Sequence, residues 1–165
     1  MEKLIDRVIP PSDYQHRNGF NNFPIIDGLT ENEKLMLERD LIVRLQSEAG
    51  EQIDTLIVDT LAYLKSTEAL TVLRELLEQS TDPVVTLPIV TAIYEICHDP
   101  EMVDIAVKLI EQIDDIGDAY YVYKLTPAFY YLASFKNDKT RKILMSYTTH
   151  PQYLVSYNAK QALRL

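Results

Sequence analysis

The stretch from Ile53 to Ile113, IDTLIVDTLAYLKSTEALTVLRELLEQSTDPVVTLPIVTAIYEICHDPEMVDIAVKLIEQI, decides the fold of this chain. Its apolar residues recur every three or four positions, which places them on one face of a helix with about 3.6 residues per turn. The first such face consists of Ile53, Leu56, Ile57, Leu61 and Leu64. Similar faces follow up to Ile113, so the pattern predicts consecutive amphipathic helices joined by very short turns.

Residues that start helices separate these apolar faces. Ser66 offers a side-chain oxygen to the free backbone N–H groups of a helix beginning there. Asp82-Pro83 and Asp99-Pro100 are further starts. The carboxylate caps the helix, and the missing N–H of proline would have had no partner in the first position. We therefore expect helices to begin at about residues 66, 82 and 99.

These helix starts recur at a nearly constant interval. Upstream of the central stretch, Thr30 and Glu33 have the spacing of a capping box, in which each side chain bonds the backbone N–H of the other residue. The candidate caps Thr30, Ser66, Asp99 and Asn137 are 36, 33 and 38 residues apart. A period in the thirties with two helices per period indicates a helical repeat array, whose hairpins bury their apolar faces on stacked neighbours. We predict an all-α fold with a repeat domain over residues 30–165.

Residues 1–29 do not follow this period. The segments 10–13 and 18–22 carry turn and loop signals. Several apolar residues nevertheless make this region unlike a free tail, namely Tyr14, Phe20, Phe23, Ile25 and Ile26. We predict an irregular N-terminal arm over residues 1–29 that caps the end of the repeat domain. The alternative is an arm that reaches a partner or a second copy of the chain.

The paired helices, their interval and the two Asp-Pro starts resemble the HEAT-repeat family of α-solenoids. The resemblance covers about residues 30–165 as four hairpins. Tetratricopeptide and ankyrin patterns fit less well, because the chain has no Trp and no Thr-Pro-Leu-His turn. The HEAT resemblance implies a short right-handed α-solenoid whose concave face is made by the second helix of each hairpin. It implies no reaction, because function depends on sites rather than folds.

The chain is acidic, with a formal net charge of −9 over 165 residues. This charge repels nucleic-acid phosphates and anionic membrane surfaces, so we expect no nucleic acid and no membrane among its partners. It favours a protein partner of basic or mixed charge. The sequence has no apolar run long enough to span a membrane and no signal-peptide core in residues 1–6, so we expect a cytoplasmic protein. The oligomeric state stays open.

No residue pattern points to catalysis, and we predict neither an enzyme nor a bound cofactor or metal. His16, His98 and His150 are isolated beside loops, without the spacing that places two ligands on one helix face. Cys97 follows an apolar helix face, which predicts a buried structural thiol rather than the nucleophile of a Cys–His dyad. Phosphate-loop, dinucleotide and Gly-x-Ser-x-Gly motifs do not occur.

Tyrosine is unusually frequent, with eleven residues against four Phe. Its large ring, few rotatable bonds and hydroxyl group enrich it at binding surfaces. If the second helices turn their apolar stripes toward the first helices, their opposite faces carry the candidate partner-binding residues. These are Asp59, Tyr94, Tyr120, Lys124, Tyr131, Tyr153 and Tyr157. The alternative is that most of these tyrosines pack between helices with their hydroxyls at the rim.

These observations predict a non-enzymatic protein-binding module. Compact, acidic, HEAT-like chains resemble some immunity proteins that neutralise bacterial toxins, and this is the form of the module that we favour. One alternative is an adaptor or regulatory subunit of a larger assembly. Another is a HEAT-like enzyme that acts on nucleic acid or is of lyase type. The net charge disfavours a nucleic-acid substrate, which would require a basic groove.

Overall fold

The chain is all-helical over the residues that the structure describes. A computed structural model places residues 3–48 and 53–165, which form eleven α-helices, one short 3-10 helix and no β-strand. The first helices are α1 (Leu4–Val8), α2 (Tyr14–Arg17) and α3 (Phe23–Asp27). The others are α4 (Glu31–Ser47), α5 (Thr55–Tyr63), η2 (Thr67–Ala69), α6 (Leu70–Gln79), α7 (Pro83–Cys97), α8 (Glu101–Ile113), α9 (Tyr121–Ser134), α10 (Asp138–Tyr147) and α11 (Tyr153–Ala162). The predicted all-α class is confirmed.

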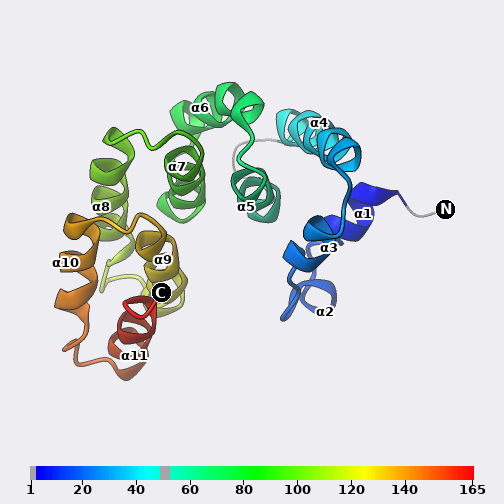
Figure 1. The fold of residues 1–165 in the computed structure, drawn as a ribbon. Helices are drawn as coiled ribbons and strands as arrows, with labels where there is room; N and C mark the ends of the chain where they lie inside the picture. The colour runs from blue at the N-terminus through cyan, green and yellow to red at the C-terminus, as the bar shows by residue number, and fades with distance from the viewer. Residues whose placement is uncertain (1–2, 49–52) are drawn as a thin grey trace.

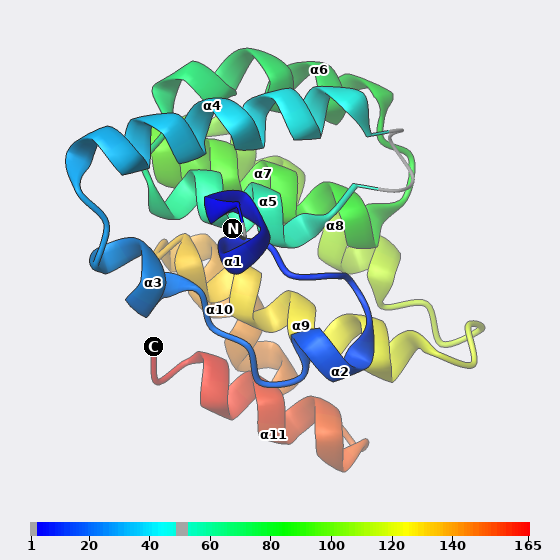
Figure 2. The same cartoon turned by 90° about the vertical axis from the view of Figure 1, so that its right-hand side faces the viewer.

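Helices α4 to α11 lie in two layers along an arc (Figure 1). The outer side of the arc is formed by α4, α6, α8 and α10, and the inner side by α5, α7, α9 and α11. Each inner helix packs against the next one, α5 on α7, α7 on α9 and α9 on α11. In a view rotated by 90° about the vertical axis, α4 and α6 lie side by side above α5 and α7 (Figure 2). The inner helices therefore share one continuous face.

The helix starts predicted from the sequence are capped as expected. Thr30 Oγ1 accepts the N–H of Glu33 at 3.3 Å, and Glu33 Oε2 accepts the N–H of Thr30 at 2.8 Å, which completes the capping box. Ser66 caps η2, which leads directly into α6. Backbone N–H groups two residues ahead likewise donate to the side chains of Asp82, Asp99 and Asn137. Thr30, Ser66 and Asn137 are thus N-caps with side-chain hydrogen bonds, whereas the N-cap of α8 is Pro100, which follows Asp99 and forms no such bond.

One predicted boundary differs by several residues. The apolar face from Ile53 to Leu64 predicts a helix from about Glu51, but α5 begins at Thr55, because Asp54 accepts the N–H of Leu56 and caps the helix there. The helix break expected at Gly50 lies outside the described residues. The other helices predicted beyond residue 29 begin and end within about two residues of the prediction, which is the usual uncertainty of helix ends.

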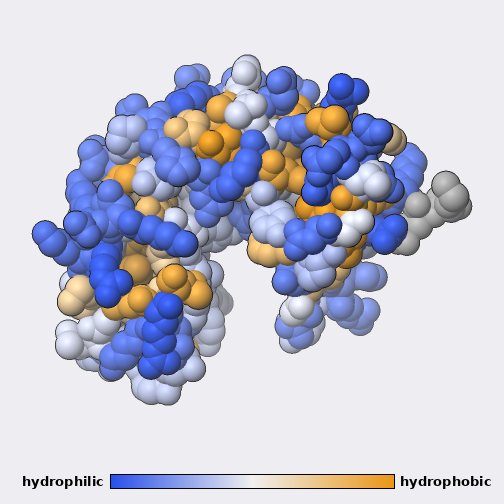
Figure 3. Space-filling model, in the orientation of Figure 1, coloured by the Kyte–Doolittle hydropathy of each residue, from blue (hydrophilic) through white to orange (hydrophobic). Residues whose placement is uncertain are grey.

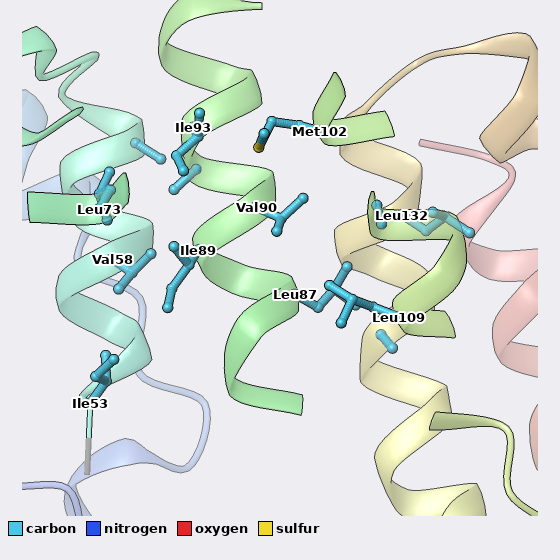
Figure 4. Packing of buried hydrophobic residues seen from close by; sticks show 14 of the residues in the cluster. Ile53, Val58, Leu73, Leu87, Ile89, Val90, Ile93, Met102, Leu109 and Leu132 are labelled. Atoms are coloured by element: carbon cyan, nitrogen blue, oxygen red, sulfur yellow. The ribbon is translucent and has the colours of Figure 1, made fainter. Parts of the chain in front are cut away.

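Helix α7 is the centre of the core and is buried on all sides. Every residue from Thr86 to Ile93 is buried. Ile89 and Ile93 point toward α5 and α6, whereas Leu87 and Val90 point toward α8 and α9 (Figure 4). The sequence predicted a single apolar stripe here, but α7 contacts all four of these helices.

No helix within residues 3–48 and 53–165 is long and apolar enough to cross a membrane.

Residues 3–29, the predicted irregular arm, contain three helices of four or five residues, joined by segments without regular structure. Asn22 Nδ2 donates to Thr60 Oγ1 of α5 at 2.7 Å. Arg17 donates two hydrogen bonds to the Asp54 carboxylate that caps α5, at 3.1 and 2.6 Å. The arm also buries Val8, Ile9 and Ile26. It thus packs against the α4–α5 end of the arc.

The helices of the arm have a local cause. Asp13 gave a turn signal in the sequence, but it is the N-cap of α2 and accepts the N–H of His16 at 3.1 Å. Asn22, another turn signal, is the residue before α3. Asp and Asn favour turns and helix starts for the same reason, because their short side chains reach nearby backbone N–H groups.

Candidate functional site on the inner helices

A pocket opens on the inner side of the arc. Figure 3 shows the hollow between the part of the molecule formed by α9 and α11 and the part formed by α2 and α3. Three inner helices and the start of α3 line a pocket of about 380 Å³, which we call the inner pocket. Its charged and aromatic lining residues are Phe23, Asp59, Tyr63, Glu95, Tyr130 and Tyr131. Among the described residues, no Lys or Arg lines it.

Asp59 and Tyr131, both predicted site residues, meet in this pocket. The Tyr131 hydroxyl of α9 donates to Asp59 Oδ2 of α5 at 3.0 Å, across 72 positions of sequence. The pKa of the Asp59 carboxyl is raised to about 7, chiefly because burial disfavours its charge. The hydrogen bond from Tyr131 opposes this rise, and the negative charges of Glu95 and Asp54 add to it. Burial and the nearby Asp59 carboxylate also raise the pKa of the Tyr131 hydroxyl.

Glu95 supplies the second carboxylate of the inner pocket. It lies one helical turn after Thr91, so both residues of α7 face the pocket. Its backbone oxygen accepts from Lys65 Nζ at 3.0 Å. Its carboxylate makes no hydrogen bond or ion pair with another residue in the described part of the chain. Glu95 therefore presents a negative charge without a protein counterion.

Aromatic rings form the rest of the lining. Phe23 and Tyr63 stack with ring centroids 4.0 Å apart and planes 6° from parallel. The Tyr63 hydroxyl donates to Asp27 Oδ1 at 2.7 Å, and the Tyr130 hydroxyl donates to Asn158 Oδ1 at 3.0 Å. All three residues still expose part of their surface, 39% for Phe23, 37% for Tyr63 and 38% for Tyr130. The pocket combines open aromatic faces with negative charge.

The other predicted site residues lie outside the inner pocket. Tyr94 is half-buried, with its ring centroid 4.7 Å from Phe135 and 5.5 Å from His98. Lys124 pairs with Asp118 and lines a separate small pocket beside α5 and α7. The most exposed residues of the set are Tyr120, Tyr153 and Tyr157. Some of these tyrosines therefore pack between helices, whereas others face solvent.

A second pocket, of about 700 Å³, adjoins the first along the ends of α5, α7 and α9. Glu95 lines both pockets. Lys65, His98 and Lys136 line the second, and they follow the three inner helices with backbone φ of 55°, 56° and 46°. Left-handed φ at helix ends usually belongs to glycine, so these three residues are alike in an uncommon backbone geometry. The inner face thus carries an acidic, aromatic pocket beside a lysine-lined edge.

Cys97 is exposed, which contradicts the predicted buried thiol. It is the last residue of α7, whereas the buried run of that helix ends at Ile93. Its Sγ donates to the Ile93 carbonyl at 3.2 Å and lies 3.9 Å from Arg74. The apolar spacing of α7 extends to its last turn, but the neighbouring helices do not cover that turn, so the spacing predicted too much burial.

Within the described residues, no group of three or more His, Cys, Asp or Glu is placed to hold a metal ion.

Several residues of the inner pocket are not among the site residues predicted from the sequence. Tyr63 follows Asp59 by four positions, and Glu95 follows Thr91 by four. Because residues four apart share a helix face, this spacing was the signal that could have found them. Phe23 gave no such signal, since it comes from the arm and reaches the pocket only through the tertiary fold.

No protein-family model, curated protein or solved structure matches this chain. The HEAT resemblance therefore stays a prediction. The proposal that follows depends on the geometry and charge of the inner face.

Proposed function

We propose that this chain is a non-enzymatic protein-binding module, built as a short HEAT-like α-solenoid, that holds its partner on the inner face. The recurring helix starts and the two layers of paired helices support the solenoid architecture. The inner pocket is the observation that carries the proposal. It gathers exposed aromatic rings and two carboxylates from four separate elements on one hollowed face.

The chemistry of this face favours a partner of basic or mixed charge. Aromatic side chains provide most of the contact energy at many protein interfaces. The carboxylates of Asp59 and Glu95 add negative charge, and the net charge of −9 attracts basic partners from a distance. The lysines at the adjoining edge would meet acidic groups of the same partner.

A charge reversal in the pocket tests this function. The wild-type chain and the variants Glu95→Lys and Glu78→Lys serve as bait in an affinity pull-down, with partners identified by mass spectrometry. Glu78 lies exposed on the outer helix α6, so its variant has the same net charge with an intact inner face. We expect one dominant partner that Glu78→Lys retains and Glu95→Lys loses. Equal capture by both variants would place binding elsewhere.

The favoured form of the module is an inhibitor that neutralises a toxin, as immunity proteins do. If the captured partner harms cells when expressed alone, co-expression of this chain should restore growth. The Glu95→Lys variant should not restore it, although it accumulates to the same level. A stoichiometric partner that harms no cell would instead favour the adaptor or regulatory subunit.

A second candidate is an enzyme that uses Asp59 as a general acid or base. One observation favours it, because a carboxyl pKa of about 7 suits proton transfer at neutral pH. The two carboxylates of the pocket would repel a nucleic-acid backbone. Base release from alkylated DNA, followed by chromatography, tests the nucleic-acid form of this candidate. Release that Asp59→Asn abolishes would replace the binding-module proposal.

A further inference from the structure

We propose that the inner pocket receives the cationic side chain of a lysine or arginine that the partner protein presents. This inference rests on the proposed binding function and names the group that the pocket recognises. Its basis is the meeting of three exposed rings, Phe23, Tyr63 and Tyr130, with two carboxylates, Asp59 and Glu95. Each part of that set attracts a cation for a separate physical reason.

The aromatic faces attract a cation through the negative charge above each ring. Phe23 of α3 and Tyr63 of α5 stack on each other, and Tyr130 of α9 lines the same pocket. The Tyr63 hydroxyl donates to the Asp27 carboxylate, which polarises the ring toward greater electron density. Such rings contact the aliphatic stem of lysine or the plane of a guanidinium group as well as its charge.

The carboxylates lack a counterion that a ligand would supply. The Glu95 carboxylate forms no ion pair among the described residues, although Lys65 Nζ donates to the Glu95 backbone oxygen, and the only described hydrogen-bond partner of the Asp59 side chain is Tyr131. The groups that act on Asp59 are Glu95 from α7, Tyr131 from α9 and Asp54 from its own helix start, and none of them is cationic. A bound ammonium or guanidinium group would stabilise both negative charges.

The size and surroundings of the pocket favour a protein side chain over a free polycation. A volume of about 380 Å³ is near the lower end for ligand pockets and suits one long side chain. Lys65 and Lys136 line the adjoining pocket and would repel further positive charges there. The geometry therefore fits one cation within a segment of mixed charge.

Nuclear magnetic resonance titration with two short peptides tests this inference without a known partner. The probe is acetyl-Gly-Ser-Lys-Ser-Gly-amide, and its matched control replaces lysine by norleucine, which keeps the stem but removes the charge. We expect the lysine peptide to shift the signals of pocket residues and to bind at least tenfold more tightly than the norleucine peptide. The affinity should rise as the pH passes from 6 to 8, because the cation prefers ionised Asp59.

Two variants link the binding to the pocket. Glu95→Gln removes one charge from a side chain that has no described partner, and Tyr130→Leu removes one ring. Each variant should bind the lysine peptide about five- to tenfold more weakly than the wild type does. Glu78→Gln on the outer face should leave the affinity unchanged. Circular dichroism melting of each variant confirms that the fold is retained.

Several outcomes would overturn the inference. Equal affinity for the two peptides, or no shift of pocket signals, would exclude recognition of a cation. Such a result would not contradict the proposed protein-binding function if the Glu95→Lys variant still fails to capture the partner protein. Micromolar binding of spermidine that the lysine peptide cannot displace would assign the pocket to a free organic cation. A dimer in analytical ultracentrifugation that Glu95→Lys abolishes would assign it to a second copy of this chain.

Discussion

The ionisation of Asp59 is coupled to folding. In the unfolded chain its carboxyl titrates near the ordinary pKa of 3.8, whereas in the folded chain the pKa is about 7. Between these values the unfolded state gives up its proton first, so rising pH favours unfolding. The stabilising contribution of the protonated Asp59 carboxyl is fully present below about pH 4 and is lost between about pH 4 and pH 7. Above pH 7 the effect of Asp59 on stability no longer changes with pH.

The variant Asp59→Asn should therefore gain stability only at higher pH. The amide keeps the shape of the side chain and an acceptor for Tyr131, but it carries no charge to bury. We expect its free energy of unfolding to exceed that of the wild type by about 4 kcal/mol at pH 8 and to be close to it at pH 4. Urea unfolding at both pH values measures the difference.

Asp118 provides the matched control for Asp59. Its hydrogen bond with Lys124 lowers its pKa, which is the opposite direction. Asp118→Asn should therefore bring no gain at pH 8. An equal change in the free energy of unfolding of Asp59→Asn at pH 4 and pH 8 would contradict a raised pKa for Asp59 in the folded chain.

At the scale of the element, the inner helices share an unusual ending. Lys65, His98 and Lys136 adopt left-handed φ after α5, α7 and α9. The Lys65 N–H donates to Ala62 and the Ser66 N–H to Leu61, which is the pattern of a Schellman turn. A residue with a Cβ atom is strained there, so glycine is the usual choice. The chain keeps polar side chains at all three ends, at the edge of the inner face.

Replacing Lys136 by glycine should relieve this strain. Lys136→Gly should raise the free energy of unfolding by about 0.5–1 kcal/mol, because glycine adopts left-handed φ without a steric cost. The control is Lys142→Gly, at an exposed interior position of α10, which should lose about 1 kcal/mol. Thermal unfolding followed by circular dichroism measures both. A loss of stability in Lys136→Gly would show that the contacts of the lysine side chain stabilise the fold by more than the left-handed φ destabilises it.

At the scale of the whole molecule, the arm joins the arc through a few polar contacts. Arg17 donates to both carboxylate oxygens of Asp54 and also to the backbone oxygen of Pro10. It therefore ties the arm to the start of α5. The same arm carries Phe23 to the inner pocket, where it stacks on Tyr63. Stability and the candidate site thus depend on one junction.

Arg17→Met should weaken this junction. The variant leaves the Asp54 carboxylate, whose side chain is only 9% exposed, without its closest cation. We expect a loss of about 2–3 kcal/mol in the free energy of unfolding and faster amide hydrogen exchange in α1, α2 and α3. Lys34→Met, which removes an exposed ion pair with Glu31, should change the free energy by less than about 0.5 kcal/mol. Unchanged exchange in the arm would mean that its apolar contacts alone hold it.

The sequence by itself determined the local structure of this protein. Apolar spacing and capping residues act over three or four positions, so they predicted the capping box at Thr30 and the buried face of α4. They failed in the arm, where Asp13 caps a helix that gave only turn signals. They also failed at Cys97, because spacing does not reveal where neighbouring helices stop covering α7.

Only the tertiary structure decided which distant residues meet. Tyr131 reaches Asp59 across 72 positions, and Phe23 of the arm reaches Tyr63 of α5. The periodicity of a helix shows which face is apolar, but it does not give the angle at which one pair of helices packs on the next. That angle brings α5, α7 and α9 around one pocket, and the resulting burial raises the pKa of Asp59.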